Sequence, residues 1–159
     1  MTSEFVHLHN HSDYSLLDGA QRIDQLINTI GDLNMDSVAL TEHGNMFSVV
    51  PFYQKAKKAG INPIIGCETY VAVGSRHDKK LQPGGGWGNN HLILLVQNQI
   101  GYENLMKLVT AGYLEGFYYR PRIDMDLLEK HSEGLVCLSG CLKGEIPEKM
   151  LNGDYNGAR

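Results

Sequence analysis

The sequence predicts an α/β fold in which helices lie outside a parallel sheet or barrel. Short β-rich apolar runs alternate along the chain with segments whose apolar residues recur at helical spacing. The run Val38-Ala39-Leu40 is continuously apolar, as expected for a strand that is covered on both faces. A length of 159 residues with 42% hydrophobic residues is enough for one domain with its own core.

The first half of the chain supplies the first β-α-β units. A short strand is expected at 5–9, followed by a turn-rich stretch that ends at Asp18-Gly19. One apolar face predicts a helix that ends near Asn34, and it comprises Ile23, Leu26, Ile27, Ile30 and Leu33. A strand at 37–41 follows, and then a helix at 46–59 that Gly60 closes as a C-terminal cap.

The second half continues the alternation after one interruption. A β-branched run predicts a strand at 61–73, and the glycine-rich stretch 74–90 predicts a mobile loop. The later elements are a strand at 91–97, helices at 102–114 and 124–131, and a strand at 135–139 that ends in Gly140-Cys141.

Three histidines alternate near the N-terminus, at His7, His9 and His11. On an extended segment, side chains two residues apart lie roughly 6.6 Å apart and point the same way. Imidazoles arranged like this can converge on metal ions at N-to-metal distances of about 2.0–2.1 Å. Alternating histidines also arise by chance, so this pattern alone does not distinguish a metal site from a chance arrangement.

The positions of other polar residues favour the metal site. In parallel α/β folds, reactive groups collect where strands end and loops converge. The residues that follow this rule are His9, His11, Glu42, His43, Glu68 and Cys141. His91 opens its strand and fits the rule less well. A chance scatter of such residues would not gather at strand ends.

Simpler roles compete at several of these positions. Asn45 is a plausible N-terminal helix cap, and Asp18-Gly19 is a common turn pair, so both positions stay open. Asp124 and Asp126 open a helix, where acidic residues suit the helix dipole, and we assign them to capping rather than to metal. Cys67 and Cys137 lie in apolar strands and are expected to be core thiols.

Other classes of site are excluded by spacing. The glycine run at 84–88 lacks the Lys-Ser or Lys-Thr of a nucleotide-binding loop. No cysteine has an arginine six residues later, so the loop of a cysteine phosphatase is absent. Cys137 and Cys141 are not followed by a second ligand pair, which argues against a structural zinc finger.

Composition bounds the compartment and the partners. A formal net charge of -4 argues against a long nucleic-acid-binding face, so contacts with nucleic acid should be local. The N-terminus has no signal-peptide pattern and no apolar run could span a bilayer, so we expect a soluble, cytoplasmic protein with no membrane partner. Three cysteines without a secretory signal indicate reduced thiols.

Four ordered motifs carry a family resemblance that covers essentially the whole chain. They are FVHLHNHSDYSLLDG at 5–19, GCETY at 66–70, GFYYRPRID at 116–124 and LSGCL at 138–142. Together they resemble the polymerase and histidinol phosphatase (PHP) superfamily. The resemblance is strongest to the N-terminal PHP domain of bacterial replicative DNA polymerases, the DNA polymerase III alpha subunits.

This resemblance implies a distorted (β/α)7 barrel that holds up to three metal ions. The ligands carried over by motif are His9, His11, Asp18, His43, Glu68, His91 and Cys141, with His7 in a supporting role. Mixed nitrogen, oxygen and sulfur ligands suit zinc, manganese or iron better than magnesium or calcium, and we expect zinc or manganese. The family's final Asp-x-His motif and the polymerase palm are absent, so we expect 1–159 to be an N-terminal portion of the PHP domain that cannot itself extend DNA.

The resemblance implies a phosphoesterase that acts on the 3′ end of DNA, a 3′–5′ proofreading exonuclease. A metal-bound water would attack the phosphate, with Asp18 and Glu68 bridging the ions. The implied partners are primer-template DNA, the remainder of the polymerase subunit, a separate proofreading subunit and the sliding clamp. Two alternatives remain: a non-catalytic scaffold that docks a proofreading subunit, and a stand-alone phosphatase of small phosphate esters.

Overall fold

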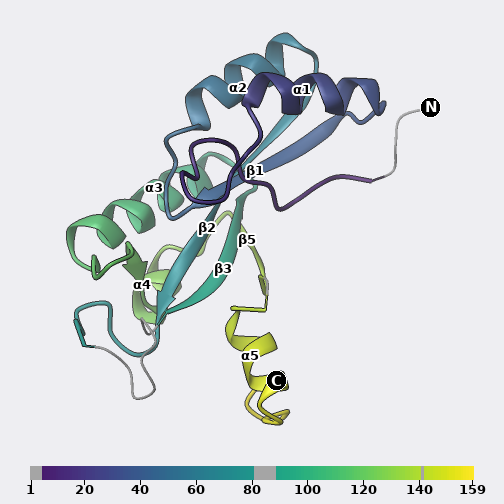
Figure 1. The fold of residues 1–159 in the computed structure, drawn as a ribbon. Helices are drawn as coiled ribbons and strands as arrows, with labels where there is room; N and C mark the ends of the chain where they lie inside the picture. The colour runs from purple at the N-terminus through teal and green to yellow at the C-terminus, as the bar shows by residue number, and fades with distance from the viewer. Residues whose placement is uncertain (1–4, 81–88, 141) are drawn as a thin grey trace.

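A mixed five-stranded sheet lies at the centre of the computed structural model, which describes residues 5–80, 89–140 and 142–159 (Figure 1). The strands are β1 (Ser37–His43), β2 (Asn62–Ala72), β3 (Asn89–Val96), β4 (Arg122–Ile123) and β5 (Leu135–Leu138). Their order is β1-β2-β3-β5. β4 pairs with the later part of β2, beyond the residues that pair with β1.

The sheet is not wholly parallel, and the expectation is wrong for β3. β1 and β4 run parallel to β2, whereas β3 runs antiparallel to both β2 and β5. Parallel neighbours need a crossover connection, usually a helix, and no helix of the described residues lies between β2 and β3. The start of β3 therefore lies beside the end of β2.

The helices are α1 (Ile23–Asp32), α2 (Val49–Lys58), α3 (Gln99–Leu114), α4 (Met125–Lys130) and α5 (Glu145–Leu151). α1 and α2 pack against Val38 and Leu40, and α3 packs against Cys67 and Leu94. The strand register places these four sheet residues on one face, because alternate residues share a face and Glu42 pairs with Cys67, which pairs with Leu94. Helices thus cover one face, as predicted for the outside of a barrel.

The opposite face carries a small apolar cluster and a polar one. Ala39, Ile93 and Leu95 form the apolar cluster. His43, Glu68 and His91 share this face by the same alternation and register. The face that the helices leave uncovered is therefore the one that bears the candidate metal ligands.

The predicted N-terminal strand is not formed, although residues 5–10 are extended along β1. The carbonyl oxygens of His7 and Asn10 accept hydrogen bonds from the backbone N–H groups of Ala39 and Thr41, each at 2.9 Å. A step of three residues along the N-terminal segment therefore matches a step of two residues along β1. These residues cannot form the regular hydrogen-bond ladder of a strand pair. The Asn10 side chain occupies the gap and donates to the Ala39 carbonyl at 3.1 Å.

Other boundaries differ from the prediction in ways that local chemistry explains. α3 begins three residues early because the Asn98 side chain caps it, accepting from the Gly101 N–H at 3.0 Å. α2 begins at Val49, after a turn. β4 and α5 were not predicted, since both are too short for a periodic signal.

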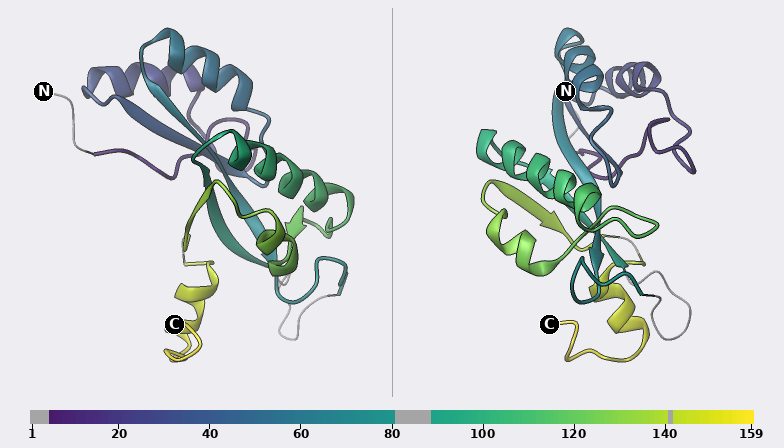
Figure 2. Two further views of the ribbon diagram at one scale, coloured as in Figure 1. Left: turned by 180° about the vertical axis from the view of Figure 1, so that it is seen from behind. Right: turned by 90° about the vertical axis from the view of Figure 1, so that its left-hand side faces the viewer.

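The predicted loop at 74–90 is described in part. Residues 81–88, with the whole glycine run at 84–88, lie outside the described residues, and Asn89 and Asn90 belong to β3. In both views of Figure 2, α3 runs along the sheet whereas α5 extends beyond it towards the C-terminus. No helix among the described residues is both long and apolar enough to cross a membrane.

Candidate metal centre

Four histidines surround the carboxylate of Glu68, which lies within β2 and is 1% exposed. Glu68 Oε2 lies 2.9 Å from His9 Nε2, 3.0 Å from His11 Nε2 and 3.3 Å from His43 Nδ1. Glu68 Oε1 lies 2.5 Å from His91 Nδ1. One buried carboxylate therefore faces four imidazoles.

Sheet register explains how distant residues meet at Glu68. His43 ends β1 and pairs directly with Glu68, and His91 pairs with Tyr70 two residues further along β2. His91 lies at the start of β3, and the antiparallel direction of that strand brings it to the same edge. The rule of strand ends thus holds for His91 once the direction of β3 is known.

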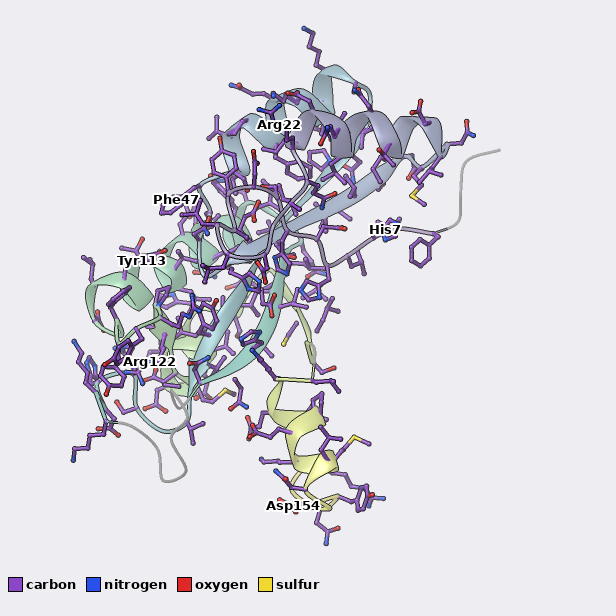
Figure 3. The ribbon with its side chains drawn as sticks, in the orientation of Figure 1. His7, Arg22, Phe47, Tyr113, Arg122 and Asp154 are labelled. Atoms are coloured by element: carbon purple, nitrogen blue, oxygen red, sulfur yellow. The ribbon has the colours of Figure 1, made fainter. Side chains whose placement is uncertain are left out.

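His9 and His11 come from the extended N-terminal segment. Their rings are 4.8 Å apart, and the His11 ring stacks on His43 at 4.0 Å between centroids. His7 lies outside the cluster, and its ring packs edge-on against Phe5 instead (Figure 3). Its carbonyl, rather than its imidazole, supports the site by anchoring the segment to β1.

The donor set fits divalent metal ions. Two overlapping triads, His9-His11-Glu68 and His43-Glu68-His91, each bring ligand atoms within 4.8 Å of one another. Two ligands at about 2.0–2.1 Å from a tetrahedral ion lie about 3.3 Å apart, and the distances of 2.9–3.3 Å from Glu68 Oε2 to His9, His11 and His43 approach this value. The Nδ1 atoms of His11 and His43 are buried without a hydrogen-bond partner among the described residues. Imidazole nitrogens with a carboxylate are common ligands of divalent metal ions.

The same arrangement shifts the pKa values of its members. Burial alone would raise the pKa of Glu68, but hydrogen bonds from His11, His91 and His9 outweigh it and hold that pKa far below its usual range. Burial would lower the pKa of His11, yet the Glu68 carboxylate raises it overall. Burial and the neighbouring His11 lower the pKa of His43. Of the two stacked rings, His11 therefore keeps its proton to a higher pH than His43 does.

We predict that metal affinity rises with pH because of this retained proton. His11 has a pKa above the usual value of about 6.5, so it must lose a proton before it can bind a metal ion. Below that pKa, displacement of one proton makes the affinity rise about tenfold per pH unit. Zinc titrations of the chain at pH values between about 5.5 and 8, in two buffers of different ionisation enthalpy, measure both the slope and the proton release. A flat profile would contradict the prediction.

Stability of the metal-free chain is expected to follow the opposite trend over this range. The raised pKa of His11 stabilises the folded state below about pH 6.5, and this contribution is lost as the pH rises through the folded pKa. His43, with its lowered pKa, offsets part of the effect. The lowered pKa of Glu68 stabilises the folded state above about pH 4.3, and that contribution is lost as the pH falls.

The two other predicted ligands are Asp18 and Cys141. Asp18 meets the cluster only through His43, whose Nε2 lies 2.9 Å from its Oδ2, and its side chain is 59% exposed. It therefore stands at the edge of the centre. Cys141 lies outside the described residues. The structure thus brings together His9, His11, His43, Glu68 and His91.

Glu42 holds the loop that carries His11 and Asp18, a role that its position at a strand end did not reveal. Its carboxylate is 1% exposed and accepts hydrogen bonds from the hydroxyls of Ser12 and Ser15 and from the Ser12 N–H at 3.1 Å. Ser15 Oγ in turn accepts from the His43 N–H at 3.1 Å. This network ties together two ligand-bearing segments, the loop that follows His11 and the end of β1 that carries His43.

Gly44 is required where the chain leaves His43. Its φ is +62°, and a Cβ there would lie 2.8 Å from the Pro121 side chain and 2.9 Å from the Tyr70 ring. Its N–H donates to the Glu68 carbonyl at 2.8 Å. The turn fixes His43 beside Glu68, whereas Asn45 hydrogen-bonds within the turn, to the N–H of Phe47 at 3.1 Å.

The remaining assignments are settled by contacts. Asp124 caps α4, accepting from the Leu127 N–H at 3.1 Å, as predicted. Cys67 is buried, as predicted. The prediction for Cys137 is wrong: this thiol is exposed, because β5 is a short strand at the edge of the sheet.

Comparison with known proteins is consistent with this geometry. The PHP domain family matches residues 7–159. DNA polymerase III subunit alpha of Borreliella burgdorferi is 55% identical over 157 residues, and that of Treponema pallidum is 50% identical over 149 residues. These matches cover 99% and 94% of this chain but only 14% and 13% of the relatives.

Among solved structures, an amidohydrolase from Chromobacterium violaceum aligns with a TM-score of 0.47 and 23% identity. That alignment covers 67% of this chain and 32% of the amidohydrolase. The extent of the family match and the ordered motifs carry the assignment: this chain belongs to the PHP domain family.

Proposed function

We propose that this chain forms the metal-dependent phosphoesterase site of a DNA polymerase III alpha subunit, and that the site removes nucleotides from the 3′ end of DNA. The observation that carries the proposal is the sharing of Glu68 by two ligand triads. A carboxylate that belongs to both ligand sets suits a pair of ions about 3.5–4 Å apart, and such pairs serve phosphoryl transfer. The 55% identity to a polymerase subunit supports the polymerase setting over a stand-alone phosphatase.

The ligands of the proposed site are His9, His11, His43, Glu68 and His91, with Cys141 and Asp18 as further candidates. Divalent ions bound by these residues would supply Lewis-acid stabilisation of the phosphoryl group and would make a bound water more acidic. Glu68, held ionised, orients the imidazoles through its two oxygens. Asp18 orients His43 through Nε2, and its carboxylate is exposed at the edge of the site.

The proposed partners follow from this setting. DNA presents the phosphodiester, and the rest of the polymerase subunit presents the primer end. A separate proofreading subunit and the sliding clamp are further proposed partners, with local contacts to nucleic acid because the chain has a net charge of -4. Residues 1–159 are proposed to form the N-terminal portion of the PHP domain.

The test measures metal content and 3′-end digestion together. The 159-residue chain and the full polymerase subunit that carries it are loaded with zinc or manganese and incubated with 5′-labelled DNA. We expect stoichiometric metal and metal-dependent shortening from the 3′ end, both lost in His9→Ala. A subunit that binds metal stoichiometrically but leaves the ends intact would overturn the exonuclease and favour the scaffold. Hydrolysis of small phosphate esters without digestion of DNA would favour a phosphatase.

A further inference from the structure

A cavity of about 1000 Å³ opens beside the candidate metal centre. His43, His91 and Asp18 line one side of it, and Phe47, Tyr113 and Arg120 are among the residues of the other. A volume of this size is at the upper end of small-molecule sites, which span about 300–1,000 Å³. It greatly exceeds what a single phosphate group needs.

Arg120 lines this cavity and has no acidic partner among the described residues. The three arginines of this region differ in what they bind: Arg76 pairs with Glu115 and Asp124, and Arg122 donates to the carbonyls of Gly116 and Asp78. Arg120 instead lies over the Tyr70 ring, 5.6 Å from its centroid. No carboxylate among the described residues forms an ion pair with Arg120, so its guanidinium remains available to an anion.

Arg120 is positioned by a tight backbone turn that includes an unfavourable conformation. Tyr119, just before it, has a φ of +57°, a region that residues with a Cβ rarely adopt. The Tyr118 N–H donates to the Arg120 carbonyl at 3.0 Å and closes a tight turn. The turn places the guanidinium over Tyr70, whose ring in turn lies 5.1 Å from that of His91. Arg120 is thus linked by two ring contacts to the metal centre.

Two aromatic rings form an exposed shelf on the same cavity. Phe47 lies just after the turn at Gly44, and Tyr113 lies near the end of α3, as Figure 3 shows. Their ring centroids are 6.4 Å apart, and Phe47 is 67% exposed. A large aromatic side chain left this open beside a cavity offers a flat surface for stacking.

We propose that this cavity binds the terminal nucleotides of single-stranded DNA, with a phosphate at Arg120 and with bases stacked on the separate ring faces of Phe47 and Tyr113, whose planes are tilted by 44°. The inference rests on the proposed function and specifies its substrate contacts. Stacking on aromatic rings together with a cation for the backbone is the common means of binding single strands without reading sequence. A small phosphate ester would leave the shelf unused.

Acidic residues also line the cavity, and they affect how DNA can bind there. Asp13, Asp18 and Glu148 also line it, and Glu148 accepts a hydrogen bond from the Asn90 side chain at 2.7 Å. Their charge opposes that of DNA unless divalent ions offset it. Binding of a DNA end is therefore expected to require the metal ions as well as Arg120.

The test measures binding rather than hydrolysis. A short fluorescent oligonucleotide with a phosphorothioate at its 3′-terminal linkage is titrated with the manganese-loaded chain, and anisotropy is followed at several salt concentrations. Phe47→Leu keeps an apolar side chain at this exposed position but removes the ring. We expect Phe47→Leu and Tyr113→Ala each to weaken binding about tenfold without changing the salt dependence. Arg120→Gln should weaken binding and lower the slope of log K against log salt by about 0.7.

Controls separate this proposal from its alternatives. Tyr155→Ala removes an exposed ring that does not line the cavity and should leave the affinity unchanged. Unchanged affinity in Phe47→Leu, Tyr113→Ala and Arg120→Gln would overturn the proposal, as would a loss that follows a loss of bound manganese. Binding that depends on the shelf in a chain that never shortens DNA would sustain this inference while refuting the proposed exonuclease.

Discussion

Glu68→Gln is expected to abolish stoichiometric metal binding and, with it, any phosphoesterase activity. Glu68 belongs to both ligand triads, so its loss removes the anionic ligand from both at once. The amide also turns an NH₂ group towards imidazoles that face a carboxylate in the native chain, at 2.9 Å for His9 and 3.0 Å for His11. Residues that only support ligands cost about 10–100-fold in affinity when mutated, and a shared ligand should exceed that range.

The measurement is zinc and manganese content after dialysis, with titration calorimetry for the affinity. Glu129→Gln is a matched control, because this exposed residue on α4 carries the same change of charge away from the centre. We expect it to bind metal as the native chain does. A Glu68→Gln chain that retained two ions per molecule would show that the histidines hold the metal by other means.

The order of the longer elements could be predicted because each has a local signal, but β4, α5 and the direction of β3 could not. Apolar spacing marks α1, and the run Val38-Ala39-Leu40 marks β1, without any knowledge of tertiary contacts. A strand has the same pattern in either direction. The direction of β3 depends on the connection after β2, and only the register reveals that His91 lies near Glu68.

The sequence could predict which residues form the polar cluster, but not which of them lies at its centre. Alternating histidines and strand ends pointed to His9, His11, His43 and Glu68, but nothing in the sequence showed that Glu68 alone would face four imidazoles. The sequence also did not show that Arg120 and Arg122 have different roles. Which arginine lies buried among carbonyl groups depends on the turn at Tyr119, which sequence patterns do not predict.

Glu42 lies beside the proposed ligand His43 in the sequence, yet its contacts indicate a different role. We expect it to act by holding the loop that carries His11 and Asp18. Each of its contacts is with a donor: the Ser12 N–H and the hydroxyls of Ser12 and Ser15. In Glu42→Gln an NH₂ group must replace one acceptor oxygen at a site that is 1% exposed. Leaving a buried donor unsatisfied costs about 1–3 kcal/mol, so we expect a loss of unfolding free energy of that order.

The loss should reach the metal as well. Ser12 adjoins His11, and Ser15 accepts from the His43 N–H, so a loosened network frees two ligand-bearing segments at once. We expect metal affinity to fall about tenfold in Glu42→Gln, within the range for residues that orient ligands. Denaturant unfolding of the metal-free chain and metal titration of the folded chain measure the two effects separately.

A double-mutant cycle with Ser15→Ala decides whether Glu42 acts through the loop. If the two residues form one unit, the double variant should lose less stability and less metal affinity than the two single variants summed, with a coupling of about 0.5–3 kcal/mol. Additive losses would mean that Glu42 supports the fold without positioning the ligands. Full metal affinity in a destabilised Glu42→Gln would lead to the same conclusion, because a residue that only supports packing changes the folded fraction and not the affinity of the folded state.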